Sequence, residues 1–183
     1  VVVMVDAGGR RTIVVTAEPL QPSGDDALPW AALGGFDAVY FTGSEPRSLS
    51  LARAARRLVV TARRRPTLTA AGVAADVVVG SASDPREDAP LEAYEPRPGA
   101  LVLTDGPRAI RVFSPHLQLV DAPAAVASPR GDYGAGDSFA GALTYFVAAG
   151  MVVADAARAA GPYGAAVLGG VDPLEHQAPL ARR

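Results

Sequence analysis

The feature that most constrains the fold is a series of short apolar runs separated by segments long enough to form helices. Four such runs, rich in β-branched residues, are candidate buried strands: residues 37–42, 58–61, 76–80 and 100–104. The segment between the first two predicts a helix from an N-cap at Ser44 to about Arg57. Strands that alternate with helices indicate βαβ units, and therefore a mainly parallel sheet that is covered on both faces.

Hairpins are predicted on both sides of this alternating region. The β-rich runs 1–5 and 12–16 flank a turn that contains two glycines. The strand at 100–104 ends in a Gly-Pro turn, after which residues 109–113 return as its partner and residues 117–120 add one more strand.

Helices are predicted at residues 28–33 and, in the last third of the chain, at 139–149 and 152–168. The last of these is rich in Ala and contains Gly161-Pro162, which should break or kink it. Gly169-Gly170 should end it.

Composition excludes several classes of site. With 183 residues, 49% of them hydrophobic and 20% charged, the chain can bury a sizeable core as one domain. It has no Cys, which excludes disulfides, thiolate catalysis and Cys-bound zinc, and no Lys, which excludes a Walker A loop and a lysine Schiff base. A net charge of −2 argues against a general nucleic-acid partner. No apolar run is long enough to span a membrane and no signal peptide is visible, so we expect a cytoplasmic protein.

A glycine-rich loop, Gly134-Ala135-Gly136-Asp137, leads straight into the helix predicted at 139–149. Such a loop directs several backbone N–H groups and the positive end of the helix dipole toward one point, which suits an anion and most often a phosphate. A carboxylate beside that phosphate could take a proton from an attacking nucleophile, which would make Asp137 catalytic. The alternative is structural, because Asp is also a favoured helix N-cap.

The carboxyl ends of the predicted parallel strands carry small or polar residues. Ligands bind at this edge of such sheets. The residues that would form the edge are Thr42, Gly43, Thr61, Gly80, Ser81, Thr104, Asp105 and Gly106. Small residues also suit ordinary turns, so the pattern alone does not require a ligand. Arg63-Arg64-Arg65 is typical of a solvated surface, with a contact to phosphate as the alternative.

Two common nucleotide-binding motifs do not fit the glycine-rich loop. A dinucleotide fingerprint needs a third glycine where Phe139 stands, and a P-loop needs the Lys that the chain lacks. A dinucleotide-dependent oxidoreductase is therefore the weakest hypothesis. What remains is a phosphate cradle that carries its own carboxylate base.

Residues 134–143 resemble the C-terminal signature of the ribokinase-like (PfkB-type) carbohydrate and nucleoside kinases. Four more segments resemble that family in the same order: residues 9–12 its Gly-x-Arg-Thr hairpin, 36–43 its strand ending in Thr-Gly, 75–84 the strand before its Asn-x-x-Glu motif, and 102–106 its Thr-x-Gly nucleotide loop. The resemblance covers nearly the whole chain. It implies a three-layer α/β/α, Rossmann-like fold in which residues 1–183 form a single nucleotide-binding domain.

The region of the family that holds the sugar and most of the lid has no counterpart in this chain. The Gly-Gly/Asn motif of that region is absent, and the chain contains no Asn at all. Residues 1–16 would be a residual lid hairpin, through which a homodimer is possible. We therefore expect an N-terminally truncated relative whose acceptor the sequence does not identify, and weak or absent kinase activity from these 183 residues alone.

The activity that the resemblance implies is ATP-dependent transfer of the γ-phosphoryl group to a hydroxyl of a sugar or nucleoside. Asp137 would be the base, and Gly134, Ala135 and Gly136 would form the anion hole, with the amides of residues 135–137 as donors. The residues expected to bind ATP are Ser81, Thr104, Gly106 and Gly161.

Two motifs depart from the family. Its Asn-x-x-Glu, which supports Mg²⁺ through water, is Ser81-x-x-Asp84 here; Asp84 can still recruit Mg²⁺ through water, but the amide is lost. The Asp-Thr pair that helps to bind a monovalent cation in some members is Gly131-Asp132 here. Asp132, displaced by one position, is the alternative ligand, and a monovalent-cation site is not the favoured expectation. These departures favour the alternative function, a non-catalytic pseudokinase or regulatory relative that binds a nucleotide or sugar.

Overall fold

The computed structural model describes residues 2–6, 11–18, 20–172 and 174–180. The turn predicted between the first two strands, and residues 9 and 10 of the hairpin motif, therefore lie outside the described residues.

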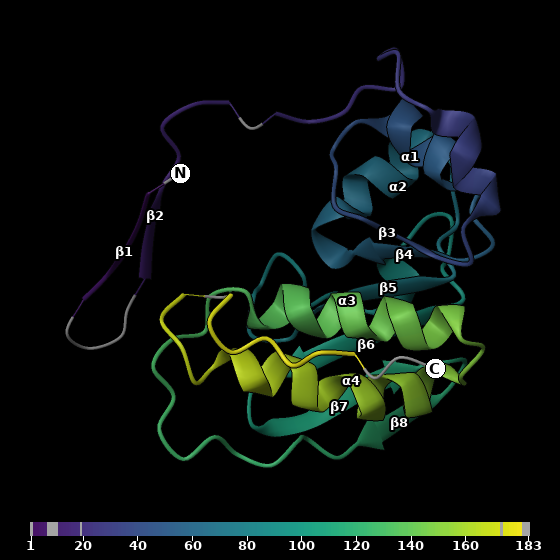
Figure 1. Ribbon diagram of the computed structural model, residues 1–183. Coiled ribbons are helices and arrows are strands. Elements are labelled where there is room, and N and C mark those ends of the chain that lie inside the picture. The colour runs from purple at the N-terminus through teal and green to yellow at the C-terminus, as the bar shows by residue number, and fades with distance from the viewer. Residues whose placement is uncertain (1, 7–10, 19, 173, 181–183) are drawn as a thin grey trace.

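A mainly parallel sheet is the centre of the structure, as the alternating pattern predicts. Within the described residues, its strands lie in the order β3-β4-β5-β6-β7-β8. The parallel strands are β3 (Val39–Phe41), β4 (Leu58–Thr61), β5 (Val77–Ser81) and β6 (Ala100–Asp105), and the antiparallel ones are β7 (Arg108–Phe113) and β8 (Leu117–Val120). Sequence order and spatial order are thus the same (Figure 1).

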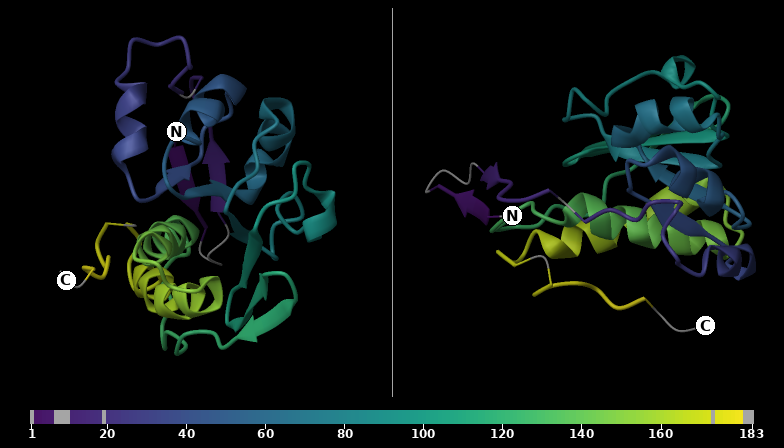
Figure 2. Two further views of the ribbon diagram at one scale, coloured as in Figure 1. Left: turned by 90° about the vertical axis from the view of Figure 1, so that its right-hand side faces the viewer. Right: turned by 90° about the horizontal axis from the view of Figure 1, so that it is seen from above.

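Helices cover both faces of the sheet, which gives three layers (Figures 1 and 2). The helices are α1 (Pro46–Ala52), α2 (Arg65–Ala71), α3 (Ala135–Ala148) and α4 (Val153–Val167). Neighbouring strand residues alternate between two buried clusters, because successive side chains of a strand point to opposite faces. Val59 packs in the cluster that contains α3 and α4, whereas Leu58 and Val60 pack in the one that contains α1 and α2.

The first helices differ from the prediction. Glu45, not Ser44, caps α1, since its carboxylate accepts the amides of Arg47 at 2.8 Å and Ser48 at 2.6 Å. The helix ends at Ala52, well before Arg57. The predicted helix at 28–33 is a 3₁₀ helix, η1 (Trp30–Gly35), and α2 and two more 3₁₀ turns, η2 (Ala62–Arg64) and η3 (Leu91–Ala93), were not predicted.

Gly161-Pro162 is predicted to break or kink the last helix, and of these two outcomes the break is wrong, because α4 runs through Pro162 without interruption. Pro162 has no N–H to donate to the carbonyl of Arg158, so one helical hydrogen bond is missing. Packing offsets this loss, since Ala156, Ala157 and Ala160 of α4 are fully buried in the cluster that α4 shares with α3 and the sheet.

The N-terminal hairpin stands apart from the three layers (Figures 1 and 2). Its strands β1 (Val2–Val5) and β2 (Arg11–Val14) pair antiparallel, with Val2 opposite Val14, as predicted. Val2, Met4 and Ile13 are about half exposed. The homodimer through this hairpin stays a prediction. None of the helices in the described part of the chain has the length and apolar character that a membrane crossing requires.

Leu101 provides a test of the sheet's contribution to stability. It lies on the central strand β6 and is fully buried, so Leu101→Ala should lower the free energy of unfolding by about 2–5 kcal/mol. Leu119→Ala, at a side chain that is 65% exposed on β8, should change it by less than about 0.5 kcal/mol. Denaturant titration of both variants measures the difference, and equal losses would contradict the arrangement described.

Candidate functional site

A cavity of about 770 Å³ lies at the carboxyl ends of β3 to β6, where α3 begins. Its volume is typical of sites for small molecules. The nine residues that the sequence analysis assigned to a site all line this one cavity. They are Ser81, Asp84, Thr104, Gly106, Gly134, Ala135, Gly136, Asp137 and Gly161. The structure therefore brings together segments that are up to 80 positions apart in the chain (81 to 161).

The start of α3 excludes the purely structural interpretation of Asp137 as a helix N-cap. The N-cap is Gly134, whose φ of 84° is in the left-handed region that favours glycine, and Asp137 is the third residue of the helix. The helix thus begins four residues earlier than the predicted 139–149.

The amides at this helix end are only partly occupied. Ala135 N–H donates to the carbonyl of Asp132 at 3.3 Å and Ser138 N–H to that of Gly134 at 2.9 Å. A helix offers no internal acceptor for its first four N–H groups, so the amides of Gly136 and Asp137 are the donors directed at the cavity. The predicted anion hole therefore loses one donor, because the amide of Ala135 is already bonded.

Two close contacts fix the position of the glycine-rich loop. Gly164 of α4 lies directly against the first turn of α3, where an added Cβ would be 3.0 Å from the carbonyl oxygen of Ala135 and 3.1 Å from Cβ of Phe139. The approach to the loop is held by Arg130 N–H, which donates to the carbonyl of Leu168 at 2.8 Å.

Tyr40 is a member of the site that sequence reasoning missed. Burial, with a smaller contribution from the charge of Asp137, raises the pKa of Tyr40 from 10.0 to about 12. The phenol therefore stays protonated, and it lies close enough to Asp137 to sense its carboxylate. Because Tyr40 is in an apolar strand, its local sequence resembles ordinary core.

A second group that sequence reasoning missed is the buried carboxylate of Glu87, which is 7% exposed. It accepts Nε of Arg63 at 2.6 Å and the amide of Ser81 at 2.8 Å. Arg63 also donates through Nη2 to Asp84 at 2.8 Å. Arg63 and Arg64 line the cavity, which agrees with the phosphate-contact alternative, whereas Arg65 lies 5.9 Å from the ring centre of Tyr94.

The expected magnesium ligand, Asp84, is engaged by two arginines. Mg²⁺ prefers free carboxylate oxygens and keeps several of its waters. Both oxygens of Asp84 already accept hydrogen bonds from Arg86, and one also accepts from Arg63. The hydrogen bonds from Arg86 lower the pKa of Asp84 to about 2. Within the described ranges, no three His, Cys, Asp or Glu side chains are grouped as a metal site.

Comparison with known proteins identifies the architecture. No protein-family model matches the chain, and no curated protein does. Among solved structures, a microbiome-derived acarbose kinase matches with a TM-score of 0.71 and 20% identity, over 92% of this chain and 61% of its own. An adenosine kinase from Sinorhizobium meliloti matches with a TM-score of 0.69 and 16% identity, over 93% of this chain and 61% of its own. The chain has the ribokinase-like fold.

A third ribokinase-like structure carries ligands. It is a candidate ribokinase II from E. coli, solved in complex with ATP and Mg²⁺, and it matches with a TM-score of 0.63 and 16% identity, over 82% of this chain and 58% of its own. The chain thus spans about three fifths of the length of these ribokinase-like neighbours. These similarities confirm the predicted fold class and the predicted likeness to sugar and nucleoside kinases.

Gly134 and Gly136 make a matched test of the loop. Gly134→Ala should lower the free energy of unfolding by about 1–2 kcal/mol, because φ at this position is 84°. Gly136→Ala lies inside the helix with no atom within 4 Å of the new Cβ, so it should leave stability unchanged or raise it by up to about 1 kcal/mol. Denaturant titration distinguishes them, and a larger loss at Gly136 would refute the helix start described.

The low pKa of Asp84 predicts a change in acid stability. Since the folded pKa of about 2 is below the ordinary 3.8, Asp84 stabilises the fold above pH 3.8, and this contribution is lost as the pH falls toward 2. Asp84→Asn should therefore lower the melting temperature at neutral pH and reduce its fall in that acid window. Thermal melts across the window measure both effects, and parallel curves for the variant and the wild type would contradict the pairing.

Proposed function

We propose that the cavity binds ATP and that the protein transfers the γ-phosphoryl group to a hydroxyl of a sugar or nucleoside. The observation that carries the proposal is the convergence of two amides and a carboxylate at the start of α3, in a cavity that the parallel strand ends also line. Phosphoryl transfer needs mainly positioning and electrostatic stabilisation, which this arrangement can supply. The ribokinase-like fold, shared with sugar and nucleoside kinases, supports the same reaction class.

Asp137 would act as the general base. As the acceptor oxygen forms its bond to the γ-phosphorus, the proton of the hydroxyl would pass to the carboxylate of Asp137, and the bond from phosphorus to the ADP oxygen would break. The amides of Gly136 and Asp137 would stabilise the charge on the transferring group. We still assign the anion hole to the loop of Gly134, Ala135 and Gly136. It has one amide donor fewer than predicted, because the N–H of Ala135 is bonded to the carbonyl of Asp132.

The nucleotide would extend along the strand ends. Ser81 and Thr104 are directly paired across β5 and β6, which sets them side by side at the edge where the phosphates would lie. Gly106, with φ of 58°, forms the turn after β6. Gly161 would face the adenine. Mg²⁺, which the ATP complex of the E. coli neighbour contains, would be coordinated here by the phosphates and water.

A non-catalytic relative that binds a nucleotide or sugar is the second candidate. The engagement of Asp84 by Arg63 and Arg86 favours it, because the carboxylate expected to support Mg²⁺ is occupied. The chain spans about three fifths of the length of the neighbouring kinases. In a complete kinase the remaining two fifths can supply the acceptor site, so these 183 residues alone also favour the non-catalytic candidate.

The two candidates are distinguished by ATP consumption with a panel of sugars and nucleosides, using full-length protein expressed from its gene. Asp137→Asn should lower kcat at least ~100-fold, because a general base contributes about 10²–10⁴, while ATP affinity measured by calorimetry stays close to that of the wild type. Asp155→Asn, the same substitution at an exposed carboxylate of α4 that does not line the cavity, is the control and should retain most of the turnover. If ATP binds but neither the wild type nor Asp137→Asn phosphorylates any acceptor, the non-catalytic candidate is correct.

A further inference from the structure

We infer that the guanidinium of Arg63 stands in for a protein-bound divalent cation at the phosphate end of the cavity, so that this chain binds a polyphosphate without a metal ion held by its own carboxylates. The inference rests on the proposed function for the class of ligand, a nucleoside triphosphate. It concerns residues that the nucleotide assignment above does not use: Arg63, Arg64 and Glu87.

Arg63 is held in a fixed orientation by two carboxylates. Its Nε donates to Glu87 at 2.6 Å and its Nη2 to Asp84 at 2.8 Å. A guanidinium carries five N–H donors in one plane, and within the described part of the chain the remaining donors of Arg63 make no further bond. The side chain is 48% exposed, so these donors are accessible to a ligand in the cavity. Such a preoriented fork suits phosphate oxygens.

The charges around Arg63 favour an anion over a dication. Within this cluster the two carboxylates, Asp84 and Glu87, are balanced by two guanidiniums, Arg63 and Arg86, so the cluster itself carries no net negative charge to attract Mg²⁺. Among the described residues, the other carboxylates that line the cavity are those of Asp132 and Asp137. Every carboxylate oxygen in the cluster already accepts a hydrogen bond. Arg64, whose Nε donates to the carbonyl of Thr42 at 2.7 Å, adds a further positive charge at the cavity wall.

Arg63 lines the same cavity as the start of α3. Tyr40 lines it as well, and the pKa of its hydroxyl responds to the charges of both Asp137 and Arg63. A polyphosphate could therefore contact the amides of Gly136 and Asp137 at one end and Arg63 at the other.

The test is calorimetric binding of ATP, and separately of inorganic tripolyphosphate, in Mg²⁺ and in EDTA. We expect both to bind in EDTA at least as tightly as in Mg²⁺. Arg63→Gln should weaken binding in EDTA about tenfold or more, since a charge-assisted contact of roughly 1.4 kcal/mol corresponds to tenfold in affinity. It should also make Mg²⁺ improve binding, because Glu87 loses its paired cation while Asp84 keeps only Arg86.

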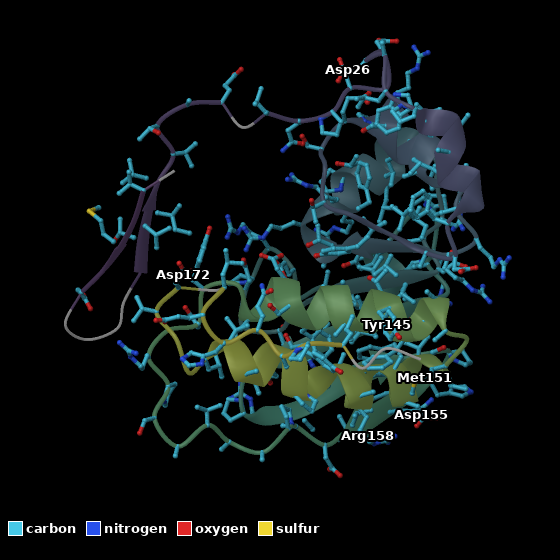
Figure 3. The ribbon with its side chains drawn as sticks, in the orientation of Figure 1. Asp26, Tyr145, Met151, Asp155, Arg158 and Asp172 are labelled. Atoms are coloured by element: carbon cyan, nitrogen blue, oxygen red, sulfur yellow. The ribbon has the colours of Figure 1, made fainter. Side chains whose placement is uncertain are left out.

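A control removes the same charge elsewhere. Arg158→Gln removes a guanidinium near the far end of the α3–α4 pair (Figure 3), and this side chain does not line the cavity. It should leave the EDTA affinity close to that of the wild type. Equal losses in Arg63→Gln and in this control would overturn the inference. Because Arg63→Gln leaves buried Glu87 without its cation, the variant Arg63→Gln/Glu87→Gln checks, with a melting curve, that the loss occurs in a folded protein.

The outcomes separate the inference from the proposed function. ATP binding that requires Mg²⁺ would overturn the inference and leave the proposed function standing. Tripolyphosphate binding in EDTA that depends on Arg63, without ATP binding, would support the inference and contradict the proposed function. Binding of neither ligand under any condition would overturn both.

Discussion

Parallel pairing of β3 to β6 is the constraint on which the site depends. Parallel strands end on the same edge of a sheet, so their last residues become neighbours whatever their separation in the chain. Ser81 of β5 and Thr104 of β6, for example, are direct partners in the strand register. α3, packed on one face of the sheet, then brings its N-terminal amides to that edge.

The electrostatics of the site follow from a chain whose basic residues are all arginines. A guanidinium can bond two carboxylates and still present donors to a ligand, whereas an ammonium group acts as a point charge. Arg63 uses this property to join Asp84 and Glu87. The same bonds occupy the two carboxylates that would otherwise be available to a metal ion, and they leave the remaining donors of Arg63 facing the cavity.

Local sequence predicted the parts of this structure that depend on local pattern. The strand at 58–61 has the predicted bounds. The glycine-rich loop and the residues assigned to the strand ends, except Gly43 and Asp105, line one cavity, because periodicity implies a sheet and a sheet implies an edge. The errors have tertiary causes. Pro162 stays within α4 because packing outweighs one missing hydrogen bond. Tyr40 and Glu87 were missed because burial and partners distant in sequence, rather than local pattern, give them their properties.

The contact between Gly164 and the first turn of α3 has a consequence for how the anion site can change. A methyl group at position 164 would be only 3.0 Å from the carbonyl oxygen of Ala135, so it would push the first turn of α3 away from α4 by a few tenths of an ångström. This shift would tilt the amides of Gly136 and Asp137 from behind, without altering any group that faces the cavity. The direction in which those amides point therefore depends on the spacing of α3 and α4. That spacing is possible because residue 164 has no Cβ.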